Sequence, residues 1–476
     1  MLVPSELLRA QVANLETALA QQKKQAEEQQ RVIKDTEASL TELRRQLNIL
    51  ASPPGVVPPE ILSVIFRLYH SEAAGANNPI QASSSPYPLT RVCGAWRRTA
   101  LSLSELWCCI ELDLGTQKLP RQLGEILMRW FGRAETRPLR LRITGYPGQR
   151  TPMRPFDFDE LQPLLARYSS RLTELVLDQT SEALIRSLDH WGLDFAVLEE
   201  ITLSVAWGRD EIHSSFASIK NAPRLRSLVL GNVYIWETGM PVPWKGLRTL
   251  SSMASTDVEE CVVALENLPL LEEMVVSLTP DTEAYRGKVR HTNLQRLGVF
   301  YEKTRDFNRL LASLVLPSLR KLELHGDASK PFNAQKMADF LERSAPPICE
   351  LTLPSLPKLD VLLLFTGRCS LVRLEISYPP ATVMGQFFDT WLSHEDFCAQ
   401  VTDLVFHTRP GATLDMFMKR TAEAVSQRQT RHLRRLEIDC NIADGQTFSE
   451  ELLAPLRQLK ADGLNLYVGS WNKRII

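Results

Sequence analysis

The chain has 476 residues, of which 44% are hydrophobic and 23% charged, a composition typical of a folded protein too long for one ordinary core. Lysine and arginine number 55 and aspartate and glutamate 56, so the net charge is -1. Such a balance provides no field to draw the whole molecule to nucleic acid or to an anionic membrane. We therefore expect two or three structural units and neither a nucleic-acid nor a membrane partner.

Targeting signals and cysteine spacing indicate the cellular compartment in which the protein is expected. The first residues lack the basic and apolar regions of a secretory signal, and no apolar run approaches the length of a membrane span. The eight cysteines are scattered, and the one close pair is adjacent in sequence, which fits neither a disulfide framework nor a metal half-site. We expect a cytoplasmic or nuclear protein.

The first fifty residues carry the most regular pattern. Positions from Leu8 to Leu50 step by four and three without a break, and ten of these thirteen positions are apolar. This spacing predicts a coiled-coil helix over residues 1–51. Gln22, Gln29 and Thr36 weaken the stripe at its centre, so two interpretations stay open. One is a coiled coil, including a homodimer through residues 5–50, and the other is an amphipathic helix lying on the rest of the protein.

A small apolar segment follows over residues 52–107. "PPEILSVIFRLYH" predicts a helix that starts at Pro59, because proline suits the first helical turn. Residues 71–88 are small and polar and predict an exposed loop. A second short helix is expected to place Leu89, Val92, Cys93 and Trp96 on one face. A third short piece ends at Trp107, and "CCIELDL" then predicts a strand.

Residues 108–476 contain a repeat of the form L-x-x-L-x-L. Copies begin at 172, 198, 225, 271, 294, 319, 348, 371, 401 and 433, with a degraded copy, "LRTLSS", at Leu247. These ten intervals cover 261 residues, a mean of about 26, which is typical of leucine-rich repeats. We expect an α/β, leucine-rich-repeat-like solenoid of parallel strands. Helical segments such as "EILMRWFGRA", "MADFLERSA" and "FFDTWLSH" would lie on its convex side.

Residues that flank the consensus apolar positions should project onto the concave face, because strand side chains alternate. They include Glu174, Asp178, Asp403, His407 and Asp439. The candidate substrate-binding residues on this face are Glu200, Arg296, Phe300, Lys321, Glu323, His325, Arg373, Glu375, Arg435 and Glu437. Their mixed signs do not indicate the charge of a ligand, and a solvated polar face is the alternative for any one of them.

The segment "VPPEILSVIF … LTRVCGAWRRTAL … LW" resembles an F-box, in the form common among fungal F-box proteins with C-terminal repeats. Val57 stands where that family usually has leucine. The resemblance implies a three-helix plug for the Skp-type adaptor of cullin-RING (SCF-type) ubiquitin ligases, with the repeats receiving a protein substrate. The candidate adaptor-binding residues are Val57, Pro58, Glu60, Ile61, Leu62, Ile65, Phe66, Leu89, Val92 and Trp96.

The small size of this unit favours a docking role. A unit of about fifty residues cannot bury enough apolar surface to be self-sufficient, so some of its large apolar side chains should contact a partner. The alternative is that these residues form the core of a helical subdomain packed on the repeats.

Catalytic motifs are absent from the sequence. There is no glycine-rich phosphate loop, no HExxH, no GxSxG and no Cys-His cluster with metal-ligand spacing. We therefore expect no enzymatic activity, no cofactor and no metal. The leading interpretation is a substrate-receptor subunit of an SCF-type ligase. The alternative is a coiled-coil and repeat scaffold without a ligase role.

Overall fold

The computed structural model divides the chain into two compact units, Met1–Trp107 and Cys108–Ile476, and each is described here by itself. The structure describes residues 3–51, 57–72, 77–113, 120, 122–145, 161–205, 212–213, 217–220, 222–234, 245–279, 287–326, 333–354, 359–366, 370–408, 412–427, 432–440, 448–470 and 473–475.

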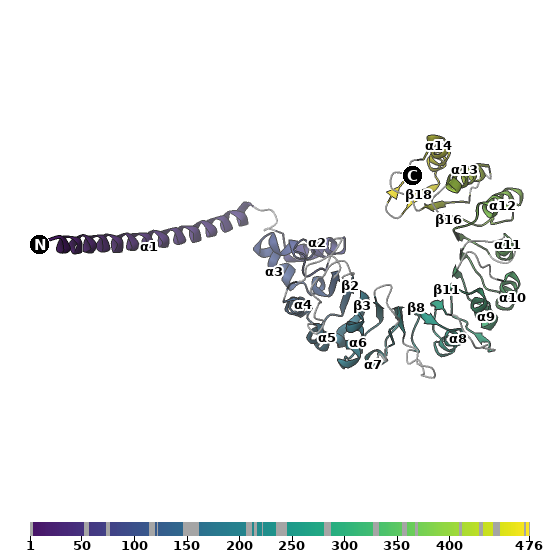
Figure 1. Cartoon of the computed structure of the whole chain (residues 1–476), viewed down its shortest axis with the longest axis horizontal. Coiled ribbons are helices and arrows are strands. Elements are labelled where there is room, and N and C mark those ends of the chain that lie inside the picture. Colours follow the sequence, from purple (N-terminus) through teal and green to yellow (C-terminus); the bar gives the residue numbers. More distant parts are fainter. Residues whose placement is uncertain are drawn as a thin grey trace. The chain divides into compact units, whose positions relative to one another are not determined.

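The first unit contains helices and short 3-10 turns. Its elements are α1 (Val3–Ala51), α2 (Pro59–Glu72), a 3-10 turn (Pro88–Arg91), α3 (Gly94–Ser102) and a second 3-10 turn (Ser104–Trp107). The long N-terminal helix predicted from the four-three spacing is confirmed as α1, which runs without interruption for 49 residues (Figure 1). As predicted, α2 starts at Pro59, and Glu60 lies in its first turn.

The core of residues 57–107 is built around the inward side of α2. Leu62 and Phe66, one helical turn apart, are buried. The ring centroids of Phe66 and Trp96 are 4.9 Å apart. The indole Nε1 of Trp107 donates a 2.9 Å hydrogen bond to the Ala100 carbonyl. These contacts join α2, α3 and the second 3-10 turn.

The expectation of three helices in this unit needs correction. The predicted second helix is split at Cys93, whose extended backbone (φ −156°, ψ 174°) ends the first 3-10 turn before α3 begins at Gly94. The predicted third piece is only the turn Ser104–Trp107, because Leu103 is also extended (φ −84°, ψ 91°). The described part of the unit therefore has two α-helices and two 3-10 turns after α1.

The predicted exposed loop over residues 71–88 is also wrong in part, although residues 73–76 lie outside the described residues. Asn77, Asn78, Ser84 and Ser85 are buried. Several of their polar groups are hydrogen-bonded: the Asn78 side-chain oxygen accepts from the backbone N–H of Ile80, and the Asn78 N–H donates to the Ser84 hydroxyl. The side-chain oxygen of Asn77 is buried without a partner among the described residues. Small polar residues can thus be interior when most of their polar groups are hydrogen-bonded.

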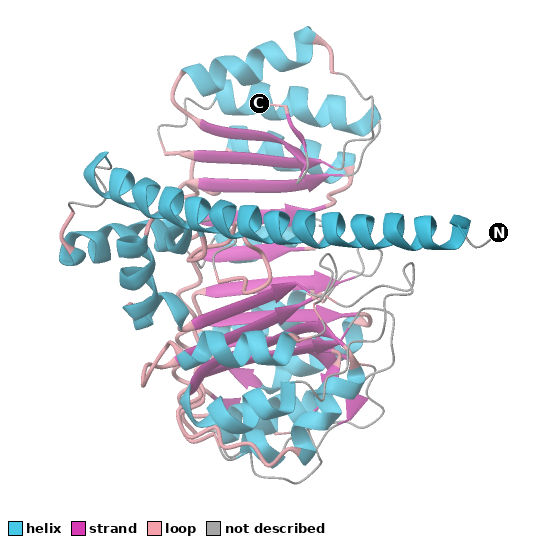
Figure 2. Cartoon of the chain, turned by 90° about the vertical axis from the view of Figure 1, so that its left-hand side faces the viewer, coloured by secondary structure: helices cyan, strands magenta, loops and turns pink. Residues whose placement is uncertain are grey.

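The second unit is organised by a 15-stranded sheet, in which neighbouring strands follow chain order (Figure 2). All pairs are parallel except the last, β18 with β19. The strands of this sheet are β1 (Cys109–Asp113), β2 (Leu139–Thr144), β3 (Leu172–Thr180), β4 (Glu200–Val205), β6 (Ser227–Gly231), β8 (Thr249–Thr256), β9 (Glu273–Leu278), β11 (Arg296–Tyr301), β13 (Lys321–Gly326), β14 (Glu350–Leu353), β15 (Arg373–Ser377), β16 (Asp403–Thr408), β17 (Arg435–Cys440), β18 (Asn465–Ser470) and β19 (Lys473–Arg474).

Two further sheets have two strands each. They pair β5 (Ile212–His213) with β7 (Val233–Tyr234) and β10 (Val289–Arg290) with β12 (Leu314–Val315). Neither sheet was expected from the sequence.

Helices connect the strands and lie on the outer side of the curved sheet in this unit (Figure 1). The segments "EILMRWFGRA", "MADFLERSA" and "FFDTWLSH" lie mostly within helices, as predicted: α4 (Leu123–Gly132), α10 (Ala334–Ser344) and α12 (Ala381–Ser393). The helices are α4 (Leu123–Gly132), α5 (Gln162–Tyr168), α6 (Glu182–His190), α7 (Ala217–Lys220), α8 (Val258–Asn267), α9 (Thr304–Ser313), α10 (Ala334–Ser344), α11 (Asp360–Thr366), α12 (Ala381–Ser393), α13 (Ala412–Gln427) and α14 (Glu450–Ala461), with a 3-10 turn at Ser169–Arg171.

Every predicted copy of the L-x-x-L-x-L repeat forms a strand, including the degraded copy, which is β8. The consensus residues face the helices and are fully buried, as Leu322 and Leu324 of β13 illustrate, while the residues between them are half-buried. This alternation follows from the two-residue period of a strand. The architecture is a leucine-rich-repeat-like solenoid, and β1, β2 and β18 extend it beyond the predicted copies.

Among the described residues, no helix combines the length and apolar character that crossing a bilayer would require.

Candidate functional site

Helix α2 exposes an apolar stripe, which is the first candidate site. Ile61, Val64, Ile65 and Leu68 recur at helical spacing and keep between 42 and 58% of their surface exposed. The opposite side of the same helix is buried in the core. An amphipathic helix normally presents polar residues to water, so a helix that is apolar on both sides indicates a contact surface.

The structure separates the predicted adaptor-binding residues into two groups. Those at the surface are Pro58, Glu60, Ile61, Ile65 and Val92, while Val57 and Trp96 are half-buried. Those inside are Leu62, Phe66 and Leu89. For this second group the assignment to an outward contact is corrected, because their side chains already pack in the unit's own core. They support the stripe by holding α2 in place.

Val64 and Leu68 belong to the stripe but were not among the predicted residues. Their positions, three and seven residues after Ile61, are the signal that could have identified them.

The inner face of the sheet, formed by the strand side chains that point away from the helices, is the second candidate site. Strand register aligns these side chains in rows. The first row contains Glu273, Arg296, Lys321, Glu350, Arg373, Asp403 and Arg435 on successive strands β9 to β17. Neighbouring strands lie about 4.8 Å apart, so charges in a row interact directly.

Nine of the ten predicted concave-face residues lie together on β11, β13, β15 and β17. Arg296, Lys321, Arg373 and Arg435 are in the first row, Glu323, Glu375 and Glu437 two residues further along, and Phe300 and His325 two residues beyond those. Glu200 lies on β4, several strands earlier in the sheet, and the structure does not bring it to the others.

Ion pairs neutralise most of this face. The Arg296 guanidinium lies 2.8 Å from Glu323 and 3.1 Å from Glu273, and the Lys321 ammonium lies 2.9 Å from Glu323. Burial alone would raise the pKa of Glu323, but the hydrogen bonds from Arg296 and Lys321 outweigh it and lower the pKa. Arg373 pairs with Glu375 at 3.1 Å and Arg435 with Glu437 at 2.5 Å.

Phe300 and His325 form a stacked pair of rings on adjacent strands β11 and β13. Their rings are stacked with centroids 4.3 Å apart. Burial lowers the pKa of His325, so its imidazole is neutral at pH 7. A flat, half-buried, uncharged surface beyond the glutamate row suits a peptide group or a side-chain plane.

His407 bridges two carboxylates across three strands. Its Nε2 lies 3.1 Å from Glu375 on β15, and its Nδ1 lies 3.0 Å from Asp439 on β17. The hydrogen bond with Glu375 raises the pKa of His407 against the effect of burial, and the Asp439 bond adds to it. The bond from His407 lowers the pKa of Glu375 to about 2. The bridge thus favours an imidazolium held between two carboxylates.

Replacing His407 by Gln should weaken β15–β17 in a pH-dependent way. A raised histidine pKa contributes stability that is complete below its ordinary value of 6.5 and is lost as pH rises through the folded pKa. The lowered Glu375 pKa contributes above its ordinary 4.5 and is lost as pH falls towards about 2. At pH 6 we expect hydrogen-exchange protection of peptides from β15–β17 to fall about tenfold relative to wild type, and less at pH 8.5.

The control is His394→Gln, which removes an exposed histidine after α12. It should leave the protection of β15–β17 unchanged at both pH values. An equal loss for His407→Gln at pH 6 and pH 8.5 would contradict the charged bridge.

The two candidate sites do not contain a metal-binding cluster in the part of the chain that the structure describes. Within the described part of the chain, no group of three or more histidine, cysteine, aspartate or glutamate side chains is arranged to hold a metal ion. Burial raises the pKa of the Cys109 thiol to about 12, which keeps it protonated at neutral pH.

Comparisons with known proteins do not assign the chain to a family. No protein-family model matches the chain, and no curated protein matches it. Among solved structures, the TLR13-ssRNA13 complex is 13% identical over 68% of this chain, with a TM-score of 0.33, and the chain spans about half, 47%, of that protein's length. A leucine-rich-repeat protein of Leptospira interrogans is 14% identical over 78% of this chain and 97% of its own, with a TM-score of 0.24. At TM-scores below 0.5 these likenesses carry no weight, and the repeat architecture rests on the strand order and burial described above.

Proposed function

We propose that the chain is a non-catalytic substrate receptor of an SCF-type ubiquitin ligase. In this proposal the α2 stripe docks the Skp-type adaptor, and the inner face of the repeats binds a protein substrate. The proposal includes a cytoplasmic or nuclear location.

The observation that carries the proposal is the exposed apolar stripe on a helix whose other side is already buried. Fully burying an aliphatic side chain stabilises by about 1.5–3 kcal/mol relative to leaving it exposed. Four such side chains at roughly half exposure therefore supply several kcal/mol to a complex. This apolar stripe coincides with the segment whose sequence resembles an F-box.

Adaptor binding by the full chain tests the proposal. We expect purified protein and a purified Skp-type adaptor to co-elute in size-exclusion chromatography and to bind with a micromolar or lower Kd in titration calorimetry. Absence of binding up to 100 µM adaptor, about a hundredfold above that Kd, would exclude the receptor role.

The second candidate function is a scaffold that holds partners without a ligase role. The exposed stripe of α1 favours it, because adaptor docking through α2 leaves that stripe unused. A scaffold would self-associate through α1 and bind a partner on the inner face, but it would not bind the adaptor.

A further inference from the structure

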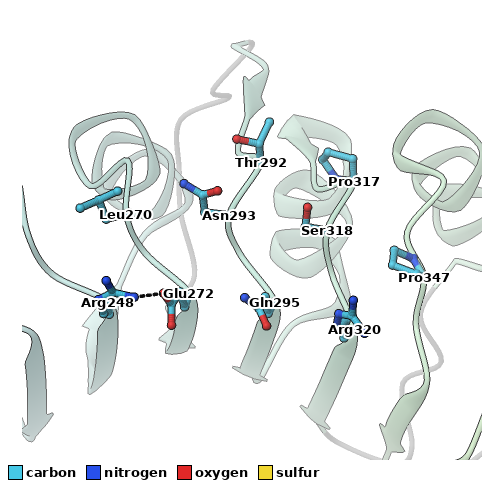
Figure 3. Close-up of a pocket in the computed structure, with 10 residues that line it drawn as sticks. All are labelled: Arg248, Leu270, Glu272, Thr292, Asn293, Gln295, Pro317, Ser318, Arg320 and Pro347. Atoms are coloured by element: carbon cyan, nitrogen blue, oxygen red, sulfur yellow. Dashed lines mark hydrogen bonds and ion pairs between the residues drawn. The ribbon is translucent and has the colours of Figure 1, made fainter.

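A polar groove lies away from the inner face, where the chain enters strands β8, β9, β11 and β13. Its volume is 640 Å³, within the range of ligand sites. Its described lining is mostly polar, which suits a peptide better than an apolar small molecule (Figure 3). The lining residues are Arg248, Leu270, Glu272, Thr292, Asn293, Gln295, Pro317, Ser318, Arg320 and Pro347.

The floor of the groove is rigid. Four lining residues each occupy the position immediately before a strand, and their successive backbones are hydrogen-bonded: Arg248, Glu272, Gln295 and Arg320. The N–H of Glu272 donates to Arg248, that of Gln295 to Glu272 and that of Arg320 to Gln295, at 2.7, 2.7 and 2.8 Å. Their side chains therefore form a row at strand spacing, which spans about 14 Å from Arg248 to Arg320.

The walls are fixed as well. The Asn293 amide donates a 2.8 Å hydrogen bond to the Pro269 carbonyl, which ties two successive turns together. Buried His291 accepts from the Leu294 N–H at 3.1 Å and contacts the Leu268 carbonyl at 3.0 Å. Pro317 and Pro347 add segments with fixed backbone angles. A site that is ordered before binding loses less entropy when a ligand enters.

The charge of the groove selects its ligand. Glu272 is the one acid in the described lining, and it forms an ion pair with Arg248. Arg320 is exposed, and the described residues include no acid or hydrogen-bond acceptor for its guanidinium. The groove therefore has one positive charge in excess, and the hydroxyl residues Thr292 and Ser318 also line it.

We propose that this groove binds a protein segment that presents a single carboxylate to Arg320. The planar guanidinium matches a carboxylate in a bidentate geometry. One excess positive charge balances a carboxylate, whereas a phosphate group would bring nearly two negative charges. Exposed Leu270 provides an apolar contact for a neighbouring side chain of the segment. The site requires neither the adaptor nor the inner face, so it stands apart from the proposed function.

Fluorescently labelled octapeptide libraries and the full chain provide the test. One library carries a single internal glutamate and an amidated end, a second has no acid but a free C-terminal carboxylate, and a third has neither. We expect fluorescence polarisation to detect binding of the first or second library, which identifies the carboxylate as a side chain or a chain end. We expect no binding of the third.

Arg320→Gln should weaken that binding at least tenfold. Arg320→Lys keeps the positive charge but loses the bidentate geometry of the guanidinium, so it should weaken binding by less. The matched control is Arg434→Gln, an exposed arginine at the equivalent position before β17 that does not line the groove. Three outcomes would each overturn the proposal. The first is equal weakening by Arg320→Gln and Arg434→Gln, and the second is binding of the third library. The third is no binding of any library at 1 mM, the weak limit of specific recognition. Unchanged hydrogen-exchange protection of β11 and β13 shows that the variant is folded.

Discussion

Replacing Ile61 by Asp is expected to abolish binding of the Skp-type adaptor while leaving residues 57–107 folded. Ile61 is 52% exposed and lies in the α2 stripe, so an aspartate there is solvated in the free protein. In the complex the same carboxylate would be buried against apolar groups without a partner, which is strongly unfavourable. We expect at least a hundredfold weaker Kd in calorimetry.

Two further variants sharpen this result. Leu62→Asp changes the neighbouring residue, whose side chain faces the core, and should lose both adaptor binding and the folded state of the unit. Gln81→Glu adds the same charge to the 77–87 segment, at an exposed position off the stripe, and should bind normally. Normal binding by Ile61→Asp would show that the stripe is not the interface, and unfolding would show that Ile61 is structural.

The full chain is expected to dimerise through α1. Leu8, Val12, Leu15, Leu19, Ile33, Leu40, Leu43 and Leu47 lie along one stripe of this helix and are between 46 and 70% exposed. An apolar stripe at four-three spacing over about six heptads is stable in water only when a partner helix covers it. In sedimentation equilibrium we expect the mass to rise with concentration from 53.9 kDa towards twice that value.

The double variant Leu15→Glu/Leu43→Glu should stay monomeric at all concentrations, because it places two carboxylates in the apolar stripe of each helix. Thr17→Glu/Ala38→Glu adds the same charge on the opposite side of α1 and should dimerise like wild type. A monomeric wild-type chain in which α1 resists proteolysis would instead support packing of the helix on the protein's own body. A dimer would present two repeat surfaces at once and raise the avidity for a partner with two binding segments.

The repeat architecture was predictable because its signal is local and recurs. Each L-x-x-L-x-L copy carries the two-residue alternation of a strand, and even the degraded copy at Leu247 forms the eight-residue strand β8. Neighbouring strands supply the burial that this weak copy lacks. By contrast, β5, β7, β10 and β12 are only two residues long, too short for any periodicity to appear in the sequence.

The pairing within the candidate sites was not predictable from the sequence. His407 occupies a recognisable position between buried strand residues, but its partners Glu375 and Asp439 each lie 32 residues away and meet it only through strand register. The core positions Leu62 and Phe66 looked equivalent to Ile61 and Ile65, since both pairs are apolar and share helical spacing. Which pair faces inward depends on how α3 packs, and that is a tertiary property.

The strictly sequential strand order has a consequence for how binding would affect the protein. Because each strand pairs only with the strands before and after it, local opening breaks one interface at an end of the sheet and two in its middle. A ligand that crosses several strands bridges units that otherwise open one at a time, and it stabilises all of them together. A segment lying along the row from Arg248 to Arg320 would thus convert β8 through β13 into one cooperative block.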